Sequence, residues 1–462
     1  MSKAASHSHP VAFYMLNFEA GNGNAKQRFN MKQITFALLA ILAFANASAQ
    51  SLDNIIPTLN FNIENIGDFN TKEETQGLEV IGKLLQDKKV IALGEATHGT
   101  LEHTVFKANI IKYLILNHSL KRIAFESEMA GSDRINQFVL NPADQSNLKD
   151  IVKESGMFDV FISDELLELI LWIRDYNEDK PDLEKVHFAG MDVQYPALVA
   201  KRILNTPKLM SLLNQAEQKS LQGYAELFHK DIFAVVPKEL LTRIILVNKK
   251  LASGIKNLDN RDSVSIYTQY NSLLSQSIKM RNKSMYLQSY YRDKYMADNT
   301  EWIANQTADN QKIVVWAHNG HISKGLLSKH NAMGLWLKRK FSNKYYALAL
   351  LAGEGSARLY NASDKIKGLS KVELPPLSNS SSLEYLFSRT KYENFIFNVE
   401  TAGASNDFKE FFKRDLYIRS IGPMLIWPMD IKVNLRKSFD GLVFFRTTNA
   451  LSPQLSASLS TF

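Results

Sequence analysis

Acidic and histidine side chains follow four short apolar segments of this 462-residue sequence. The segments are 90–93, 122–125, 186–191 and 312–317, and the side chains after them are Glu95, His98, Glu126, Asp192, His318 and His321. The whole sequence contains only ten histidines, so three of them beside three carboxylates at such positions indicate a site. A neutral imidazole can take a proton from water near neutral pH, and a neighbouring carboxylate fixes its tautomer and stabilises the imidazolium. The pattern predicts proton-transfer chemistry.

Other hydrolytic chemistries lack their residues in this sequence. It has no G-x-S-x-G segment for a nucleophilic serine, no G-x-x-x-x-G-K-[ST] phosphate loop and no cysteine. Three histidines and three carboxylates could instead hold zinc or manganese. However, His318 and His321 follow a predicted strand and lack the helical H-E-x-x-H spacing. We expect no resident cofactor, and a bound divalent metal is the alternative.

Alternating strands and helices must position these side chains. Short apolar runs predict strands, and apolar residues at helical spacing predict helices between them. The strands are expected at 88–94, 122–126, 186–192 and 312–317, with weaker candidates at 346–351, 395–398 and 442–445, and the helices at 101–118, 133–140, 164–176 and 333–341. This alternation is typical of an α/β fold with a mostly parallel central sheet flanked by helices. In such sheets ligands bind beyond the carboxyl ends of the strands, where the acids and histidines lie.

A long helical insertion separates the third and fourth strands. Residues 196–310 are polar, have leucines at helical spacing and contain few glycines and prolines. We expect this insertion to form a cap over the active site. The serine-rich run 378–382 and the tail 447–462 are expected to be loops.

The N-terminal region has the features of an export signal. Residues 31–49 combine Met31 and a lysine with an apolar run and end in Ala47-Ser48-Ala49, a signal-peptidase pattern. Residues 1–30 are then a non-native upstream extension, and residues 50–74 are a polar leader to a hydrolase domain at 75–446. The expected mature protein begins near Gln50 and is periplasmic or secreted, without stable membrane insertion after signal cleavage, because no later apolar run reaches the roughly 20 residues of a membrane span.

Composition and charge exclude several classes of protein. Hydrophobic residues make up 45% of the sequence and charged residues 22%, which is ordinary for a globular protein. The formal net charge is +8, but the lysines and arginines are scattered, so no nucleic-acid partner is expected. Without cysteine, disulfides, zinc-thiolate sites and iron–sulfur clusters are also excluded.

Eight sequence motifs, in one order over roughly residues 75–446, resemble those of the erythromycin esterase family. They are GEATHG at 94–99, AFE at 124–126, LWIRDYN at 171–177, FAGMD at 188–192, RDKYMADN at 292–299, VWAHNGH at 315–321, MG at 333–334 and FDG at 439–441. The resemblance implies an α/β sheet with a helical insertion, and hydrolysis of a macrolide lactone or related ester by water. It also implies a small-molecule substrate.

The resemblance also implies roles for individual residues. His98 takes the position of the general base, Glu95 and Glu126 line the same site, and His318 and His321 supply a second pair of histidines. Lys107, Asp192, Arg292 and Asp293 take substrate-binding positions. Lys107 departs from the arginine found there in some macrolide esterases, which replaces a planar cation by a point charge.

Two alternatives to a metal-independent esterase stay open from the sequence. One is a metal-dependent hydrolase built on the same residues. The other is a non-catalytic envelope protein of the same fold that holds a ligand or a glycan. Replacement of His98 distinguishes an enzyme from this binding protein. The enzyme would lose turnover, whereas the binding protein would keep its affinity for the ligand.

Overall fold

The computed structural model describes residues 52–67, 76–231, 234–258, 261–325, 331–360, 368–425 and 429–452. The expected extension at 1–30 and the signal peptide at 31–49 lie outside this part of the chain, as does the tail from residue 453. In the described part, no helix is both long and apolar enough to cross a membrane.

A mixed sheet forms the centre of the protein. Its strands lie in the order β1-β8-β11-β6-β2-β5-β3-β4, and β7 pairs with β6. The bounds are β1 Ile63–Asn65, β2 Val90–Leu93, β3 Leu120–Glu128, β4 His187–Asp192, β5 Lys312–Trp316, β6 Tyr345–Tyr360, β7 Leu369–Glu373, β8 Asn394–Asn398 and β11 Gly441–Thr448. The contiguous strands from β11 to β4 are parallel, whereas β1, β7 and β8 pair antiparallel. The fold is therefore the expected α/β class with a mostly parallel sheet.

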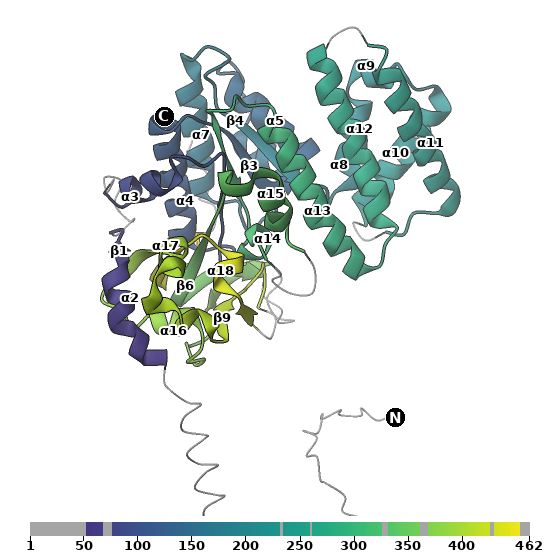
Figure 1. Cartoon of the computed structure of the whole chain (residues 1–462). Helices are drawn as coiled ribbons and strands as arrows, with labels where there is room; N and C mark the ends of the chain where they lie inside the picture. Colours follow the sequence, from purple (N-terminus) through teal and green to yellow (C-terminus); the bar gives the residue numbers. More distant parts are fainter. Residues whose placement is uncertain are drawn as a thin grey trace, which may run out of the picture. The chain divides into compact units, whose positions relative to one another are not determined.

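Helices cover both faces of the sheet because its central strands are apolar on both sides. In β5, Ile313 and Val315 pack into one apolar core, and Val314 and Trp316 pack into the other. The second core receives helices α3 (Gln76–Leu85), α4 (Leu101–Asn117), α6 (Leu148–Glu154) and α7 (Asp164–Glu178). The first receives α15 (Met333–Phe341), α16 (Leu383–Phe387) and α17 (Val399–Ala404), and α5 (Met129–Leu140) contributes to both. Figure 1 shows α4 and α7 beside strands β3 and β4.

The segment expected as an insertion is helical. It contains α8 Pro196–Leu204, α9 Pro207–Met210, α10 Gln215–Lys230, α11 Lys238–Ile255, α12 Arg261–Arg281 and α13 Met285–Ala304. Helices α8, α10, α11 and α12 pack on one another (Figure 1). Helix α13 also packs on α15 and on strand β4, so it joins the insertion to the sheet.

The region expected as a polar leader contains secondary structure in its described part. It contains η1 (Leu52–Ile55), helix α2 (Ile56–Asn62) and strand β1. Ile63 of β1 pairs with Phe397 of β8 across more than 300 residues of sequence. Such a partner is invisible in the local pattern, and a three-residue strand has no alternation to detect.

The remaining described elements lie towards the C-terminus. They are α14 Asn319–Ile322, η2 Ser342–Lys344, η3 Asn406–Phe408, η4 Phe411–Lys413, β9 Leu416–Arg419, β10 Asp430–Val433 and α18 Leu435–Ser438. Strands β9 and β10 form a separate antiparallel pair.

Candidate active site

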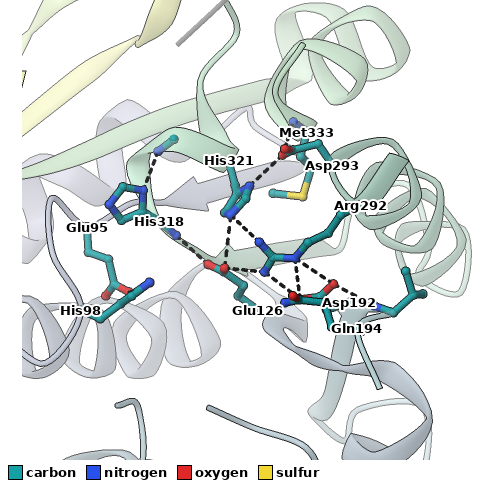
Figure 2. Close-up of polar contacts among 12 residues, drawn as sticks. Glu95, His98, Glu126, Asp192, Gln194, Arg292, Asp293, His318, His321 and Met333 are labelled. Carbon is teal, nitrogen blue, oxygen red and sulfur yellow. Dashed lines mark hydrogen bonds and ion pairs between the residues drawn. The ribbon is translucent and has the colours of Figure 1, made fainter. Parts of the chain in front are cut away.

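Four neighbouring parallel strands bring the candidate residues to one edge of the sheet. Strands β2, β5, β3 and β4 are consecutive in the sheet, so their carboxyl ends meet. Glu95 and His98 follow β2, His318 follows β5, Glu126 lies near the end of β3, and Asp192 ends β4. Figure 2 shows their side chains close together, with Arg292 and Asp293 of α13 beside Glu126, Asp192 and His321.

Glu95 connects the first histidine to a buried cation. Its Oε1 lies 2.6 Å from Nδ1 of His98, and its Oε2 accepts a hydrogen bond from Nζ of Lys107 at 2.7 Å. Burial alone would raise the pKa of Glu95, but Lys107 and the hydrogen bond from His98 outweigh burial and lower this pKa to about 2. Glu95 is therefore a carboxylate at neutral pH, and it accepts the Nδ1 proton of His98.

Two glycines allow the turn after β2 to carry this pair. A Cβ atom on Gly94 would lie 2.0 Å from Oδ1 of Asn319, which receives the main-chain N–H of Leu350 at 3.3 Å. Gly99 has a φ of +72°, and a Cβ there would lie 2.0 Å from the carbonyl oxygen of Arg358. Only glycine fits this conformation at such close approach. The turn from Gly94 to Gly99 is therefore packed against Asn319 at one end and Arg358 at the other.

Arg292 holds the carboxylates of two strands together. Its Nε and Nη2 donate to Asp192, with Nη2 2.7 Å from Oδ2, and Nη2 also lies 2.8 Å from Oε1 of Glu126. Burial would lower the pKa of Arg292, but Asp192 and Glu126 raise it above its ordinary value. Burial would likewise raise the pKa of Glu126, but His321 and Arg292 lower it far below the usual range.

His321 lies between two carboxylates. Its Nδ1 is 2.7 Å from Oδ1 of Asp293, and its Nε2 is 3.3 Å from Oε1 of Glu126. Burial would lower the pKa of His321, but Asp293 and Glu126 raise it to about 10. In the imidazolium form, Nδ1 donates to Asp293 and Nε2 donates to Glu126. Nη1 of Arg292, which is also a donor, lies 3.0 Å from the same Nε2, so it forms a hydrogen bond with His321 only when that nitrogen is unprotonated. Three carboxylates offset the repulsion between these two cations.

His318 is neutral and fixed by the main chain. Its Nδ1 accepts the N–H of Gly320 at 3.0 Å, and its Nε2 lies 3.2 Å from the carbonyl oxygen of Ala96 and donates to it. Burial lowers the pKa of His318 to about 4. Its ring centroid lies 5.3 Å from that of His98 and 6.5 Å from that of His321. The structure therefore brings together all three histidines named from the sequence.

Lys107 does not lie where a substrate-binding residue is expected. Its side chain is fully buried, bonds to Glu95, and lies 4.7 Å from the ring centroid of Trp316. Burial lowers its pKa, and Glu95 opposes that effect. Lys107 thus acts on Glu95 and has no surface to offer a substrate.

The other three substrate-binding candidates also have protein partners. Asp192 and Asp293 are buried, and Asp293 accepts the main-chain N–H of Met333 at 3.0 Å as well as the contact from His321. Arg292 keeps 17% of its side chain exposed and His321 keeps 18%. Of this group, Arg292 and His321 are the cations with surface available to a substrate.

Glu128 is a member of the cluster that sequence reasoning missed. It is the last residue of β3, is 2% exposed, and accepts the main-chain N–H of Tyr195 at 2.9 Å. Burial raises the pKa of Glu128 well above its ordinary value. The Glu126-Ser127-Glu128 sequence offered a second acid beside a predicted one, but the pairing register shifts between Phe125 and Glu128, so strand spacing does not fix the side that Glu128 faces.

The carboxylate oxygens of the cluster are engaged with protein donors. Both oxygens of Glu95, of Glu126 and of Asp192 accept hydrogen bonds. In the part of the chain that the structure describes, no three His, Asp or Glu side chains form a metal-binding group.

Together the fold and the site define an α/β protein with a buried histidine–carboxylate centre at the carboxyl ends of its parallel strands. The family model for erythromycin esterase matches residues 115–448. The chain therefore belongs to the erythromycin esterase family, and this membership supports a hydrolase acting on a small-molecule substrate.

A relative is similar to this chain in sequence, and solved structures are similar to it in fold. Erythromycin esterase type II of Escherichia coli is 25% identical over 399 residues, which cover 78% of this chain and 90% of that protein. A crystal structure of a Bacillus cereus protein is similar with a TM-score of 0.74 at 21% identity, covering 86% of this chain and 98% of that one. A mutant of the erythromycin esterase EreC, in its open conformation, gives a TM-score of 0.61 at 16% identity, covering 83% and 97%.

Proposed function

We propose that this protein is an exported hydrolase that opens a macrolide lactone or a related carboxylic ester with water activated by His98. The observation that carries the proposal is the contact of Nδ1 of His98 with Glu95, which Lys107 keeps ionised. Because Nδ1 donates to this carboxylate, the lone pair of the ring is on Nε2. This nitrogen is the acceptor for a proton from water.

The reaction then has two proton transfers through the same imidazole. As the oxygen of water attacks the carbonyl carbon, one proton passes to Nε2 of His98, and Glu95 stabilises the imidazolium that forms. When the C–O bond to the alcohol breaks, the imidazolium returns this proton to the leaving alkoxide. The products are the carboxylic acid and the alcohol, joined in one molecule if the substrate is a lactone.

The negative charge that develops on the carbonyl oxygen in the transition state is stabilised by preorganised hydrogen-bond donors, which include cationic side chains. Arg292 and His321 are the partly exposed cations of the cluster, and both pKa values lie far above neutral pH. The proposal assigns them this role. His318, which is neutral and bonded to the main chain at both nitrogens, lies beside His98 and fixes the shape of the site.

Export rests on residues 31–49, which lie outside the described part of the chain. Family membership, the charge pattern around His98 and the identity to erythromycin esterase type II support the enzymatic part of the proposal.

The test is incubation of the purified protein with a panel of macrolides and simple esters. Hydrolysis adds one water to a macrolide and, in water labelled with heavy oxygen, puts the label in the carboxylate. If no macrolide and no ester gains water, the proposed activity is wrong. Label in the alcohol would contradict attack at the carbonyl carbon.

A further inference from the structure

A hollow with basic walls lies between the segment 403–413 and helix α18. Its volume is about 640 Å³, and the charged residues that line it are Lys409, Lys413, Arg436 and Lys437. The two sides of the hollow are distant in sequence and meet because α17, which precedes the first segment, packs on α18. No carboxylate is among the described residues that line it. We call this feature the basic hollow.

Most of the positive charge of the basic hollow is not neutralised by acidic side chains of the protein. Lys413 pairs with Glu410, whose Oε1 lies 2.6 Å from Nζ, and Lys409 affects the pKa of the same carboxyl less than Lys413 does. Within the described ranges of the chain, no carboxylate forms an ion pair with Lys409, Arg436 or Lys437. A cleft lined by one sign of charge attracts and concentrates ions of the opposite sign.

Arg436 is held in place at the wall of the basic hollow. Its guanidinium lies over the ring of Phe412, 5.8 Å from the ring centroid. Gly403 approaches the same side chain so closely that a Cβ atom there would lie 2.9 Å from Nε, so a larger residue would displace the arginine. A guanidinium offers its donors in a planar fork that matches the oxygens of an anion. Because this fork is already positioned, less conformational entropy is lost when an anion binds.

A second hollow continues the positive surface past α18. Its volume is about 630 Å³, it shares Arg436 and Lys437 with the basic hollow, and its other charged lining residues are Lys324, Lys338 and Arg339. Asp440 forms an ion pair with Lys324 from outside this lining. The described charged residues that line the two hollows are therefore all basic. Lysines and arginines that are scattered in the sequence are brought together here by the fold.

We infer that the basic hollow binds a phosphate monoester. Such a group carries a charge of about −1.5 to −2 at neutral pH, whereas a carboxylate, a sulfate ester or a phosphodiester carries a single negative charge. Lys409, Arg436 and Lys437 together match the doubly charged group better, because less positive charge is left without a partner. The phosphate fills only part of the volume, and the rest admits the organic part of the ligand. The inference goes beyond the proposed hydrolysis and does not depend on it.

The test compares the binding of phenyl phosphate and phenyl sulfate, which have similar shapes but carry two charges and one charge in slightly alkaline solution. Isothermal titration calorimetry of the whole protein at low ionic strength is the measurement. The wild type should bind phenyl phosphate at least about tenfold more tightly, and Arg436→Gln and Lys409→Gln should each weaken this binding by about tenfold, because each removes a hydrogen bond to a charged group. Lys219→Gln, at an exposed position of α10, is the matched control and should keep the wild-type affinity.

Equal affinity of the wild type for the two ligands overturns the inference, and so does wild-type affinity for phenyl phosphate in both Arg436→Gln and Lys409→Gln. An equal loss in Lys219→Gln also overturns it, because binding would then follow the net charge and not the hollow. All three variants should keep wild-type activity toward a simple ester, since these residues lie outside the histidine–carboxylate cluster. A failure of the proposed hydrolysis therefore leaves the binding test unaffected.

A second measurement distinguishes a soluble phosphate monoester from a lipid headgroup of the same chemistry. The protein is sedimented with phosphatidylcholine vesicles that contain phosphatidic acid, whose headgroup is a phosphate monoester. Sedimentation that Arg436→Gln abolishes supports a lipid as the source of the group. If the wild type binds phenyl phosphate but does not sediment with the vesicles, the result supports a soluble ester.

Discussion

Nδ1 of His98 lies 2.6 Å from Oε1 of Glu95, and the second oxygen of the same carboxylate is held by a fully buried lysine. The carboxylate is thus shared between the imidazole that it orients and the cation that keeps it ionised. Leaving any one of these buried groups without its partner is costly, because an uncompensated charge would remain in an apolar environment. The geometry of the proposed base depends on all three residues.

His98→Asn should reduce kcat by about 10²- to 10⁴-fold, which is the usual contribution of a positioned general base and corresponds to about 3 to 5 kcal/mol of barrier. Asparagine keeps a polar group of similar size but cannot accept the proton of water. Steady-state kinetics with a simple ester is the measurement, with circular dichroism to check the fold. His229→Asn, in an exposed turn of α10, serves as control and should keep wild-type activity. More than about a tenth of wild-type kcat in a folded His98→Asn protein would make the general-base assignment wrong.

Lys107→Met should lower activity more strongly at acidic and neutral pH than at alkaline pH. Without the lysine charge, burial raises the pKa of Glu95, so the carboxyl becomes protonated and no longer accepts the Nδ1 proton of His98. Activity should recover as the pH rises and Glu95 ionises. The pH profile of kcat/KM is the measurement, and Lys107→Arg, which retains the charge, should keep the wild-type profile. A purely structural role for Lys107 would lower activity equally at every pH.

Chelation should leave activity unchanged, because the carboxylate oxygens of the cluster already accept hydrogen bonds from protein donors. A metal ion would have to displace Lys107 or Arg292 from these oxygens. The measurement is turnover after exhaustive dialysis against a chelator, with metal analysis of the dialysed protein. Loss of activity that a single added divalent ion restores would favour the metal-dependent hydrolase instead.

The central sheet could be predicted from the sequence because its strands are apolar on both faces. Val90 to Leu93 and Lys312 to Trp316 are buried throughout, and such runs stand out between polar helices. Strand β6 continues nine residues beyond the expected end at Leu351, where it pairs with β7. That pairing depends on residues distant in sequence, so no local pattern marks it.

The sequence was sufficient to predict most residues of the candidate site, but not all of the contacts that these residues make. The residues that end β2, β5, β3 and β4 could be grouped because parallel strands share an edge. Lys107 is buried next to the ring of Trp316, and Glu128 accepts the main-chain N–H of Tyr195. Both contacts form only when separate segments fold together, so they could not be predicted from the spacing of residues in the sequence.

The N-terminus of the exported protein should lie near Gln50. The reason is the charged start, the apolar run and the Ala47-Ser48-Ala49 sequence that precede it. Expression of the full sequence in a bacterium, fractionation of the cells and N-terminal sequencing is the measurement. Ala49→Arg should block processing and serves as the control. Recovery of an intact Met1 in the exported fraction would contradict the cleavage site.

The stabilisation that protonated His321 gives the folded protein should be lost as the solution becomes alkaline. Asp293 and Glu126 outweigh burial and raise the pKa of His321 to about 10 in the folded protein, above the ordinary value of 6.5. A group whose pKa is raised by folding contributes its full stabilisation below its ordinary pKa and loses it as the pH rises to the folded value, by about 1.4 kcal/mol for each pH unit between the two. The free energy of unfolding should therefore fall between pH 6.5 and pH 10.

His321→Asn removes the titrating group, so the variant should be less stable than the wild type in mildly acidic solution, and its stability should vary less as the pH rises. Urea unfolding of both proteins across the range is the measurement. His229→Asn controls for the loss of a histidine outside the cluster and should follow the wild-type curve. An equal slope in His321→Asn and the wild type would mean that His321 is neutral in the folded protein at neutral pH, and the cation on the carbonyl oxygen would then be Arg292 alone.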